Sequence, residues 1–188
     1  FEALKKLSEV ASRGESNLVL MGINPTYPSE KFGYIIPNDS NEISEVSTFK
    51  EKPDRKTAEE YIKQNALWNG GVFAFKLKYL LNKAHELIDF EDYKDLFGKY
   101  ETLNKISFDY AVVEKEEKIE VVRFSGKWED LGTWNSLTNV LEEKIIGNGL
   151  LSEDCENTNI VNELNIPVLG VGLKDIIIAA SPDGILVS

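Results

Sequence analysis

The sequence predicts an α/β protein with a layered, mixed sheet, followed by a short β-rich segment. Up to Glu143, apolar runs of strand length alternate with amphipathic helical patterns, which is typical of a sheet covered by helices. After Ile146, short apolar runs are separated by Gly, Asn, Ser and Pro, without a helical pattern. We therefore predict two parts, residues 1–146 and residues 147–188, the second being a linker or the start of a β-helix-like domain.

The first part opens with a helix, and a buried strand follows it. Residues 1–13 carry apolar side chains at helical spacing, and Gly14 is suited to end that helix. Residues 18–23 form one continuous apolar run. Such a run predicts a strand that is buried on both faces.

Caps and turn residues divide the rest of the chain. Asp54 and Thr133 can each cap a helix, and Trp68-Asn69-Gly70-Gly71 is typical of a turn. The strands expected in the first part cover residues 32–36, 43–50, 72–75 and 119–124. The helices expected there cover residues 56–64, 78–87, 90–99, 108–114 and 134–143. The strands expected in the second part cover residues 168–171, 176–179 and 185–187.

The composition argues against several classes of function. The net charge is −11, and an acidic surface repels nucleic-acid phosphates and anionic lipid, so we expect neither nucleic acid nor membrane as a partner. The single cysteine, Cys155, permits no intramolecular disulfide and fits a reducing cytoplasm. The single histidine, His85, is expected at a solvated helical position. Neither GxGxxG nor the P-loop signature occurs in the sequence.

Glu51-Lys52-Pro53 follows the strand expected over residues 43–50. At the end of a strand, the carboxylate can accept hydrogen bonds from sugar hydroxyls and the ammonium can meet a phosphate as a point charge. Two solvated charges before a turn are the alternative, and the motif by itself favours that alternative.

Two further segments could approach a sugar. The Asn69 amide can donate to and accept from hydroxyls, and the two glycines after it permit close approach of the backbone. Gly33 lies between two aromatic residues of an expected strand, where a glycine leaves room for a ligand near the backbone. An ordinary turn at Asn69 and a β-bulge at Gly33 are the structural alternatives.

Asp130 lies in a loop just before the helix that Thr133 can cap. A loop carboxylate can bind Mg²⁺, which prefers a few carboxylates together with phosphate oxygens. The alternative is an acidic residue that stabilises the helix N-terminus through the helix dipole.

Taken in order, these segments resemble the successive signatures of bacterial mannose-1-phosphate guanylyltransferases. The resemblance runs from about Leu18 to Glu143, and residues 170–187 resemble the strands that follow the catalytic domain in this family. The segments are Gly22-Ile23-Asn24-Pro25-Thr26-Tyr27-Pro28, Phe32-Gly33-Tyr34-Ile35, Phe49-Lys50-Glu51-Lys52-Pro53, Trp68-Asn69-Gly70-Gly71-Val72-Phe73, Ser107-Phe108-Asp109-Tyr110-Ala111-Val112-Val113-Glu114 and Trp128-Glu129-Asp130-Leu131-Gly132-Thr133-Trp134.

This resemblance implies a nucleotide-sugar nucleotidyltransferase with a Rossmann-like fold, which makes GDP-mannose and pyrophosphate from mannose 1-phosphate and GTP with Mg²⁺. It implies that Glu51 binds sugar hydroxyls and that Lys52, a catalytic residue, binds the sugar phosphate. Asn69 and the backbone at Gly33 would also contact the sugar, and Asp130 would be a catalytic ligand of the metal. Asp109 lies in the fifth of these segments, and the resemblance leaves open whether it contacts the ligand. It also leaves a homodimer open.

The chain also departs from the family pattern. Lys50 stands where an apolar residue is more usual, Phe32 replaces a usual tyrosine, and Gly70 a usual serine. The glycine-rich segment with its arginine and the first metal-binding aspartate of the family do not occur, and the chain begins at Phe1. We therefore expect the C-terminal part of a longer protein, inactive by itself. A non-catalytic sugar-phosphate-binding or interaction module and a pyrophosphorylase for another hexose 1-phosphate are the alternatives.

Overall fold

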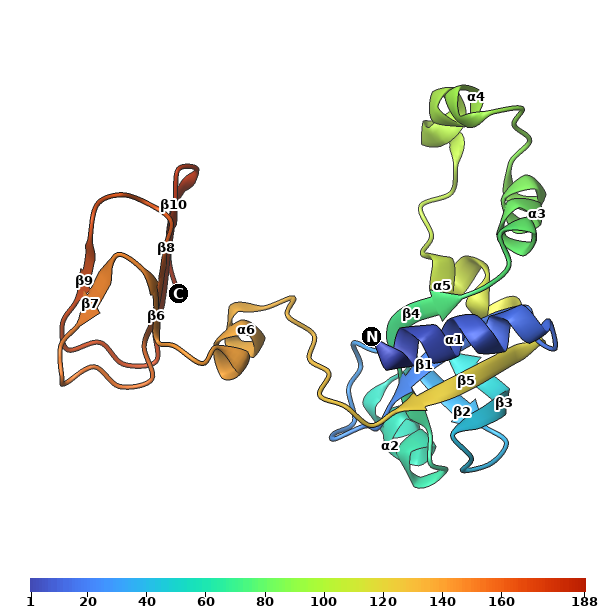
Figure 1. Cartoon of the computed structure of the whole chain (residues 1–188), viewed down its shortest axis with the longest axis horizontal. Coiled ribbons are helices and arrows are strands. Elements are labelled where there is room, and N and C mark those ends of the chain that lie inside the picture. The colour runs from blue at the N-terminus through green and yellow to red at the C-terminus, as the bar shows by residue number, and fades with distance from the viewer. The chain divides into compact units, whose positions relative to one another are not determined.

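The chain folds into two compact units, Phe1–Trp128 and Glu129–Ser188 (Figure 1). The computed structural model describes residues 1–188 apart from the side chain of Asn135. The division falls earlier than the boundary predicted near Gly147. The reason is that α6 (Trp134–Val140) belongs to the second unit, where Trp134 lines a cavity with strand residues, although its pattern groups it with the elements before it.

Five strands form a mixed sheet in the first unit, in the order β1-β4-β2-β3-β5. Strand β5 pairs in parallel with β1 and antiparallel with β3, so the sheet closes on itself. The remaining neighbours are antiparallel. The predicted mixed α/β sheet is confirmed, and its closure was not predicted. The strands are β1 (Leu18–Ile23), β2 (Tyr34–Pro37), β3 (Ile43–Lys50), β4 (Leu67–Ala74) and β5 (Ile119–Phe124).

The helices of the first unit begin and end close to the predicted positions. Gly14 ends the first helix in the left-handed conformation, with φ of 78°. The Asp54 side chain caps the second by accepting the Thr57 N–H at 2.9 Å. Within the described residues, no helix is both long and apolar enough to cross a membrane. The helices are α1 (Glu2–Arg13), α2 (Arg55–Lys63), α3 (Leu77–Leu87), α4 (Tyr93–Lys99), α5 (Phe108–Ala111) and the 3-10 turns η1 (Tyr100–Thr102) and η2 (Val113–Lys115).

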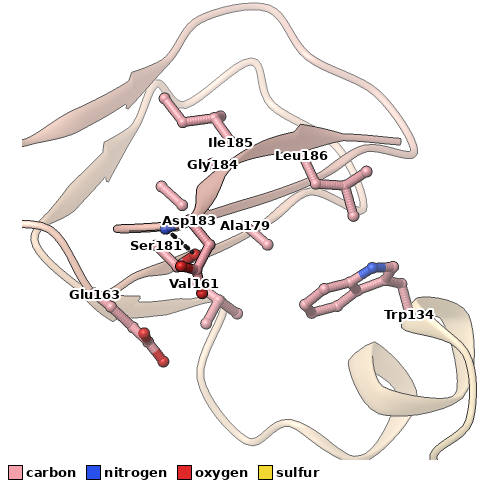
Figure 2. Close-up of a pocket in the computed structure, with 10 residues that line it drawn as sticks. Trp134, Val161, Glu163, Ala179, Ser181, Asp183, Gly184, Ile185 and Leu186 are labelled. Carbon is pink, nitrogen blue, oxygen red and sulfur yellow. Dashed lines mark hydrogen bonds between the residues drawn. The ribbon is translucent and has the colours of Figure 1, made fainter.

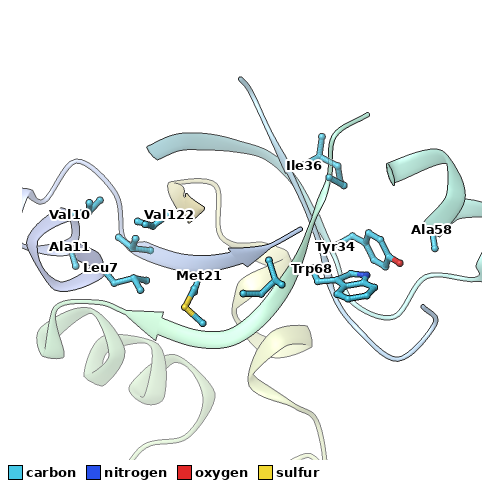
Figure 3. Close-up of a cluster of buried hydrophobic side chains, with 12 residues drawn as sticks. Leu7, Val10, Ala11, Met21, Tyr34, Ile36, Ala58, Trp68 and Val122 are labelled. Carbon is cyan, nitrogen blue, oxygen red and sulfur yellow. The ribbon is translucent and has the colours of Figure 1, made fainter. Parts of the chain in front are cut away.

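Strand β1 is buried on both faces, as its continuous apolar run predicts. Val19 and Met21 join the cluster that contains Leu7 and Val10 of α1 (Figure 3). Leu20 belongs to a second cluster, built with side chains of β5 and of the segment after α5. Alternate side chains of one strand therefore link two apolar cores.

The turn predicted at residues 68–71 is wrong, because these residues lie inside β4. The register between β1 and β4 shifts between Leu20 and Gly22, so that β4 carries extra residues there. Gly71 has φ of 70°, which a residue with a side chain rarely adopts. The Asn-Gly-Gly sequence thus marks a bulge within a paired strand.

Tyr79 attaches α3 to the core, although α3 and α4 carry no buried residue. Its hydroxyl donates to Glu116 Oε2 at 2.6 Å, and Asn17 Nδ2 donates to Glu116 Oε1 at 2.9 Å. Desolvation acts to raise the pKa of Glu116, but the hydrogen bonds from Tyr79 and Asn17 outweigh it and lower that pKa. Glu116 therefore joins the start of β1, α3 and the segment before β5.

Tyr79→Phe is expected to destabilise the protein by about 1 kcal/mol at neutral pH, because it removes a hydrogen bond to a partly exposed carboxylate. The folded-state pKa of Glu116 is lowered, so this stability is present above the unfolded-state pKa and is lost as pH falls through the folded-state pKa. Urea unfolding at neutral pH and at about pH 3 should show the difference shrinking in acid. A difference that stays constant would contradict the assignment. Tyr93→Phe, at an exposed tyrosine of α4, is the control.

The second unit is α6 followed by short strands. The structure confirms β9, β10 and β11 close to the predicted positions, and α6 ends at Val140, earlier than predicted. The three strands before them, β6, β7 and β8, were not predicted, because runs of three or four residues among Gly and Asn give little periodic signal. Strands β6, β8 and β10 pair in parallel, β11 pairs antiparallel with β10, and β7 pairs in parallel with β9. The strands are β6 (Ile145–Gly147), β7 (Gly149–Leu151), β8 (Asn159–Asn162), β9 (Val168–Gly170), β10 (Ile177–Ser181) and β11 (Gly184–Val187).

Candidate functional site

Four of the predicted site residues lie together beside the neighbouring strands β2, β3 and β4. The Asn69 N–H donates to the carbonyl of Gly33 at 2.7 Å. A Cβ added to Gly33 would lie 2.5 Å from Glu51 Oε2 and 3.2 Å from the Asn69 Cβ. Lys52 follows Glu51 directly. Together with Asp109 and Glu114, described below, we call these residues the strand-end cluster; its members are Gly33, Glu51, Lys52, Asn69, Asp109 and Glu114.

Gly33 lies one residue before β2, and not inside a strand as predicted. The ladder begins at the next residue, Tyr34, which pairs with Lys50 of β3 and Trp68 of β4. A side chain at Gly33 would meet the buried Glu51 carboxylate and the ring of Phe49 at 2.9 Å. Glycine is therefore required here by close packing of the neighbouring side chains.

Glu51 and Lys52 differ sharply in exposure. The Glu51 side chain is 6% exposed, whereas the Lys52 side chain is 51% exposed. Lys52 Nζ lies 3.2 Å from Glu51 Oε1. Lys52 has φ of 46°, so the chain bends immediately after Glu51. The bend keeps the carboxylate inside and presents the ammonium outside.

The electrostatics of this pair reflect burial and neighbouring acids. Burial raises the pKa of the Glu51 carboxyl, the hydrogen bond from Lys52 opposes the rise, and the charges of Asp109 and Glu114 add to it. The hydrogen bond to Glu51 and its charge raise the pKa of Lys52. Lys52 is therefore held in its charged form next to a carboxylate that accepts hydrogen bonds.

Asp109 orients the Asn69 amide. Asn69 Nδ2 donates to Asp109 Oδ1 at 2.9 Å, and Asn69 Oδ1 accepts the Gly71 N–H at 3.2 Å. These two bonds fix which end of the amide donates. One N–H of Nδ2 and one lone pair of Oδ1 remain for a hydroxyl-bearing ligand.

Glu114 contacts the backbone at the bend. Its Oε1 accepts the backbone N–H of Glu51 at 2.9 Å and lies 3.2 Å from Lys50 Nζ. Sequence reasoning gave Glu114 no role. The family segment that contains Asp109 and Glu114 could have pointed to both residues, but not to the groups that they bind.

Asp130 is exposed and belongs to the second unit. Its Oδ1 accepts the Gly132 N–H at 2.9 Å, so it lies in a local turn before α6. Among the described residues, no group of three or more His, Cys, Asp or Glu is arranged to hold a metal. The predicted role of Asp130 in metal binding therefore stays a prediction. His85 stacks on Phe90, with ring centroids 4.1 Å apart.

The second unit contains a cavity of about 400 Å³, which Figure 2 shows. Trp134 forms one wall, and Glu163 and Asp183 place carboxylates at its edge. Ser181 Oγ accepts the Asp183 N–H at 3.2 Å. None of the lining residues that the structure describes is a Lys or Arg, so this cavity is poorly suited to a phosphate.

Comparison with known proteins gives one family. The model of the nucleotidyl transferase family matches residues 2–145. This match includes every predicted site residue.

Individual relatives point the same way. A mannose-1-phosphate guanylyltransferase of Escherichia coli is 32% identical over 201 residues, which cover 92% of this chain and 43% of the relative. The xanthan biosynthesis protein XanB of Xanthomonas campestris pv. campestris is 32% identical over 208 residues, which cover 100% of this chain and 44% of the relative. The chain thus spans less than half the length of these two relatives.

A solved structure shares the fold. A crystal structure from Thermus thermophilus, described as a mannose-1-phosphate geranyltransferase, matches with a TM-score of 0.76 and 31% identity. The match covers 100% of this chain and 59% of that chain.

Proposed function

Because the chain belongs to the nucleotidyl transferase family, we propose that it forms the sugar-phosphate-binding part of a mannose-1-phosphate guanylyltransferase. The reaction is the transfer of a guanylyl group from GTP to mannose 1-phosphate, which gives GDP-mannose and pyrophosphate. The strand-end cluster carries this proposal, since it places a buried carboxylate, an oriented amide and an exposed lysine side by side.

The buried side of the cluster would bind the sugar. Glu51 accepts hydrogen bonds from hydroxyls, and the remaining donor and acceptor of Asn69 meet a second hydroxyl. Gly33 permits the packing that brings these two side chains together. A ring with several hydroxyls matches this set better than an apolar ligand does.

Lys52 would bind the phosphate of the sugar. A phosphate monoester has its second pKa at about 6, so it is largely a dianion at neutral pH. Its oxygen can attack the α-phosphorus of GTP without a general base, and pyrophosphate leaves. Positioning and charge neutralisation are then the main requirements of the reaction.

Asp130 would supply one ligand to a Mg²⁺ ion. Mg²⁺ commonly binds through one or two carboxylates together with substrate phosphates and water, and an exposed loop carboxylate fits that requirement. The bound ion would neutralise charge on the phosphates. The strand-end cluster with Lys50 holds three carboxylates against two lysines, so it does not by itself neutralise a dianionic substrate.

Isothermal titration calorimetry of the chain with mannose 1-phosphate, glucose 1-phosphate and mannose tests this proposal. We expect saturable binding of mannose 1-phosphate with a Kd between about 1 μM and 1 mM, in the range usual for metabolites. Mannose should bind at least about tenfold more weakly, because it lacks the group that Lys52 contacts. Absence of saturable binding would contradict the proposal. Tighter binding of glucose 1-phosphate than of mannose 1-phosphate would mean that the assigned sugar is wrong.

A further inference from the structure

The segment that carries both proposed ligand groups lies beyond the β ladder. The register between β2 and β3 starts at Lys50, opposite Tyr34, so Glu51 and Lys52 follow the last paired residue of β3. Lys52 occupies the left-handed region with φ of 46°, which is unfavourable for a residue with a long side chain. An interaction outside the ladder must therefore hold this bend.

Glu114 provides that interaction. It lies in η2, 63 residues from Glu51 in the sequence, and its Oε1 accepts the Glu51 N–H at 2.9 Å. The Glu114 side chain is 19% exposed, so this charge-assisted bond is only partly screened by water. Lys50 Nζ lies 3.2 Å from the same oxygen and balances its charge.

We propose that Glu114 is a positioning residue for the sugar-phosphate site, and that Lys50 is its counter-ion. This inference rests on the proposed function, since it assigns Glu114 to the site that binds mannose 1-phosphate. Glu114 acts through the backbone of Glu51 and does not touch the ligand. Its bond fixes the direction in which the Glu51 carboxylate and the Lys52 ammonium leave the bend.

The charge balance explains Lys50. The charge of Glu114, one of the three carboxylates of the strand-end cluster, acts to raise the pKa of Glu51 and repels a phosphate dianion. Lys50 places a positive charge beside the same Glu114 oxygen that accepts the Glu51 N–H, and so opposes that repulsion. An apolar residue at position 50 would leave the charge of Glu114 uncompensated.

Calorimetry on three variants tests the role of Glu114. Glu114→Ala removes the acceptor, and we expect the Kd for mannose 1-phosphate to rise about tenfold or more. Glu114→Gln keeps an acceptor oxygen without the charge and should restore affinity to within about threefold of wild type. Glu117→Ala, an exposed glutamate of the same segment, is the matched control and should leave the Kd unchanged. Equal affinities of Glu114→Ala and wild type would overturn the inference, as would failure of Glu114→Gln to rescue.

Amide hydrogen exchange separates this inference from the proposed function. In wild type without ligand, the Glu51 amide should be protected, and Glu114→Ala should accelerate its exchange at least about tenfold, whereas Glu114→Gln should not. If wild type binds no mannose 1-phosphate, the proposed function fails, and Glu114 then positions no ligand site even if exchange responds. If wild type binds but Glu51 exchange is unchanged in Glu114→Ala, the positioning role alone is overturned.

Discussion

Leu20→Ala is expected to lower the free energy of unfolding by about 2–5 kcal/mol, which is a large part of the stability of an ordinary domain. Leu20 is fully buried in β1, and its cluster includes Ile35, Leu67 and Val121 from three other strands. The substitution removes apolar contacts and leaves a cavity. Because the sheet is closed, its strands cannot easily move together to fill that cavity.

Urea unfolding followed by circular dichroism measures this loss, with the slope of the transition unchanged if the native state stays compact. Leu77→Ala makes the same change at a residue that is 67% exposed, and it should cost less than about 0.5 kcal/mol. A loss below about 1 kcal/mol for Leu20→Ala would mean that β1 is not the centre of the core.

The position of β1 was predictable because its signal is local. A continuous apolar run needs both faces covered, and the two clusters on either side of β1 satisfy that requirement. Helix caps are equally local, and Asp54 and Thr133 act where predicted. Such features depend on a few neighbouring residues, so tertiary contacts did not override the local preference.

The segment after Trp68 shows where local signals fail. Asn-Gly-Gly favours a turn, but β4 pairs with β1 on one side and β2 on the other, and these ladders override the local preference. The conformational freedom of Gly71 is still used, in the bulge. Closure of the sheet was unpredictable for a similar reason, since it depends on pairing between β3 and β5, which are far apart in sequence.

The sequence selected candidate residues, but it gave no geometry for them, and their roles in binding stay predictions. The ordered motifs selected Gly33, Glu51, Lys52, Asn69 and Asp130. The structure brings the first four together, whereas Asp130 belongs to the second unit. The backbone bond from Glu51 to Glu114 joins distant segments, and no periodicity or spacing encodes it. Hydrogen bonds of this kind become visible only when the fold is known.

Lys52→Met is expected to weaken the binding of mannose 1-phosphate by about 30–100-fold, because it removes a charge-assisted contact with a phosphate dianion. Binding of mannose should change by less than about threefold, because mannose has no group for the ammonium to meet. Calorimetry with both ligands measures the two effects separately. The Lys52 side chain is half exposed, so salt should screen its charge. The difference in affinity for mannose 1-phosphate between wild type and Lys52→Met should therefore shrink in ~1 M salt.

Two comparison variants make the Lys52 result specific. Lys63→Met removes an exposed lysine from the last turn of α2 and should leave both affinities unchanged, which excludes an effect of net charge alone. Glu51→Gln should weaken the binding of both ligands, since Glu51 is assigned to hydroxyls that mannose and mannose 1-phosphate share. If Lys52→Met lowered the affinities for mannose and mannose 1-phosphate equally, Lys52 would only support Glu51 through their 3.2 Å contact. The assignment of Lys52 to the phosphate would then be wrong. A selective loss of mannose 1-phosphate assigns the phosphate to Lys52 and, because Glu51 precedes it directly, orients the sugar toward the buried side of the cluster.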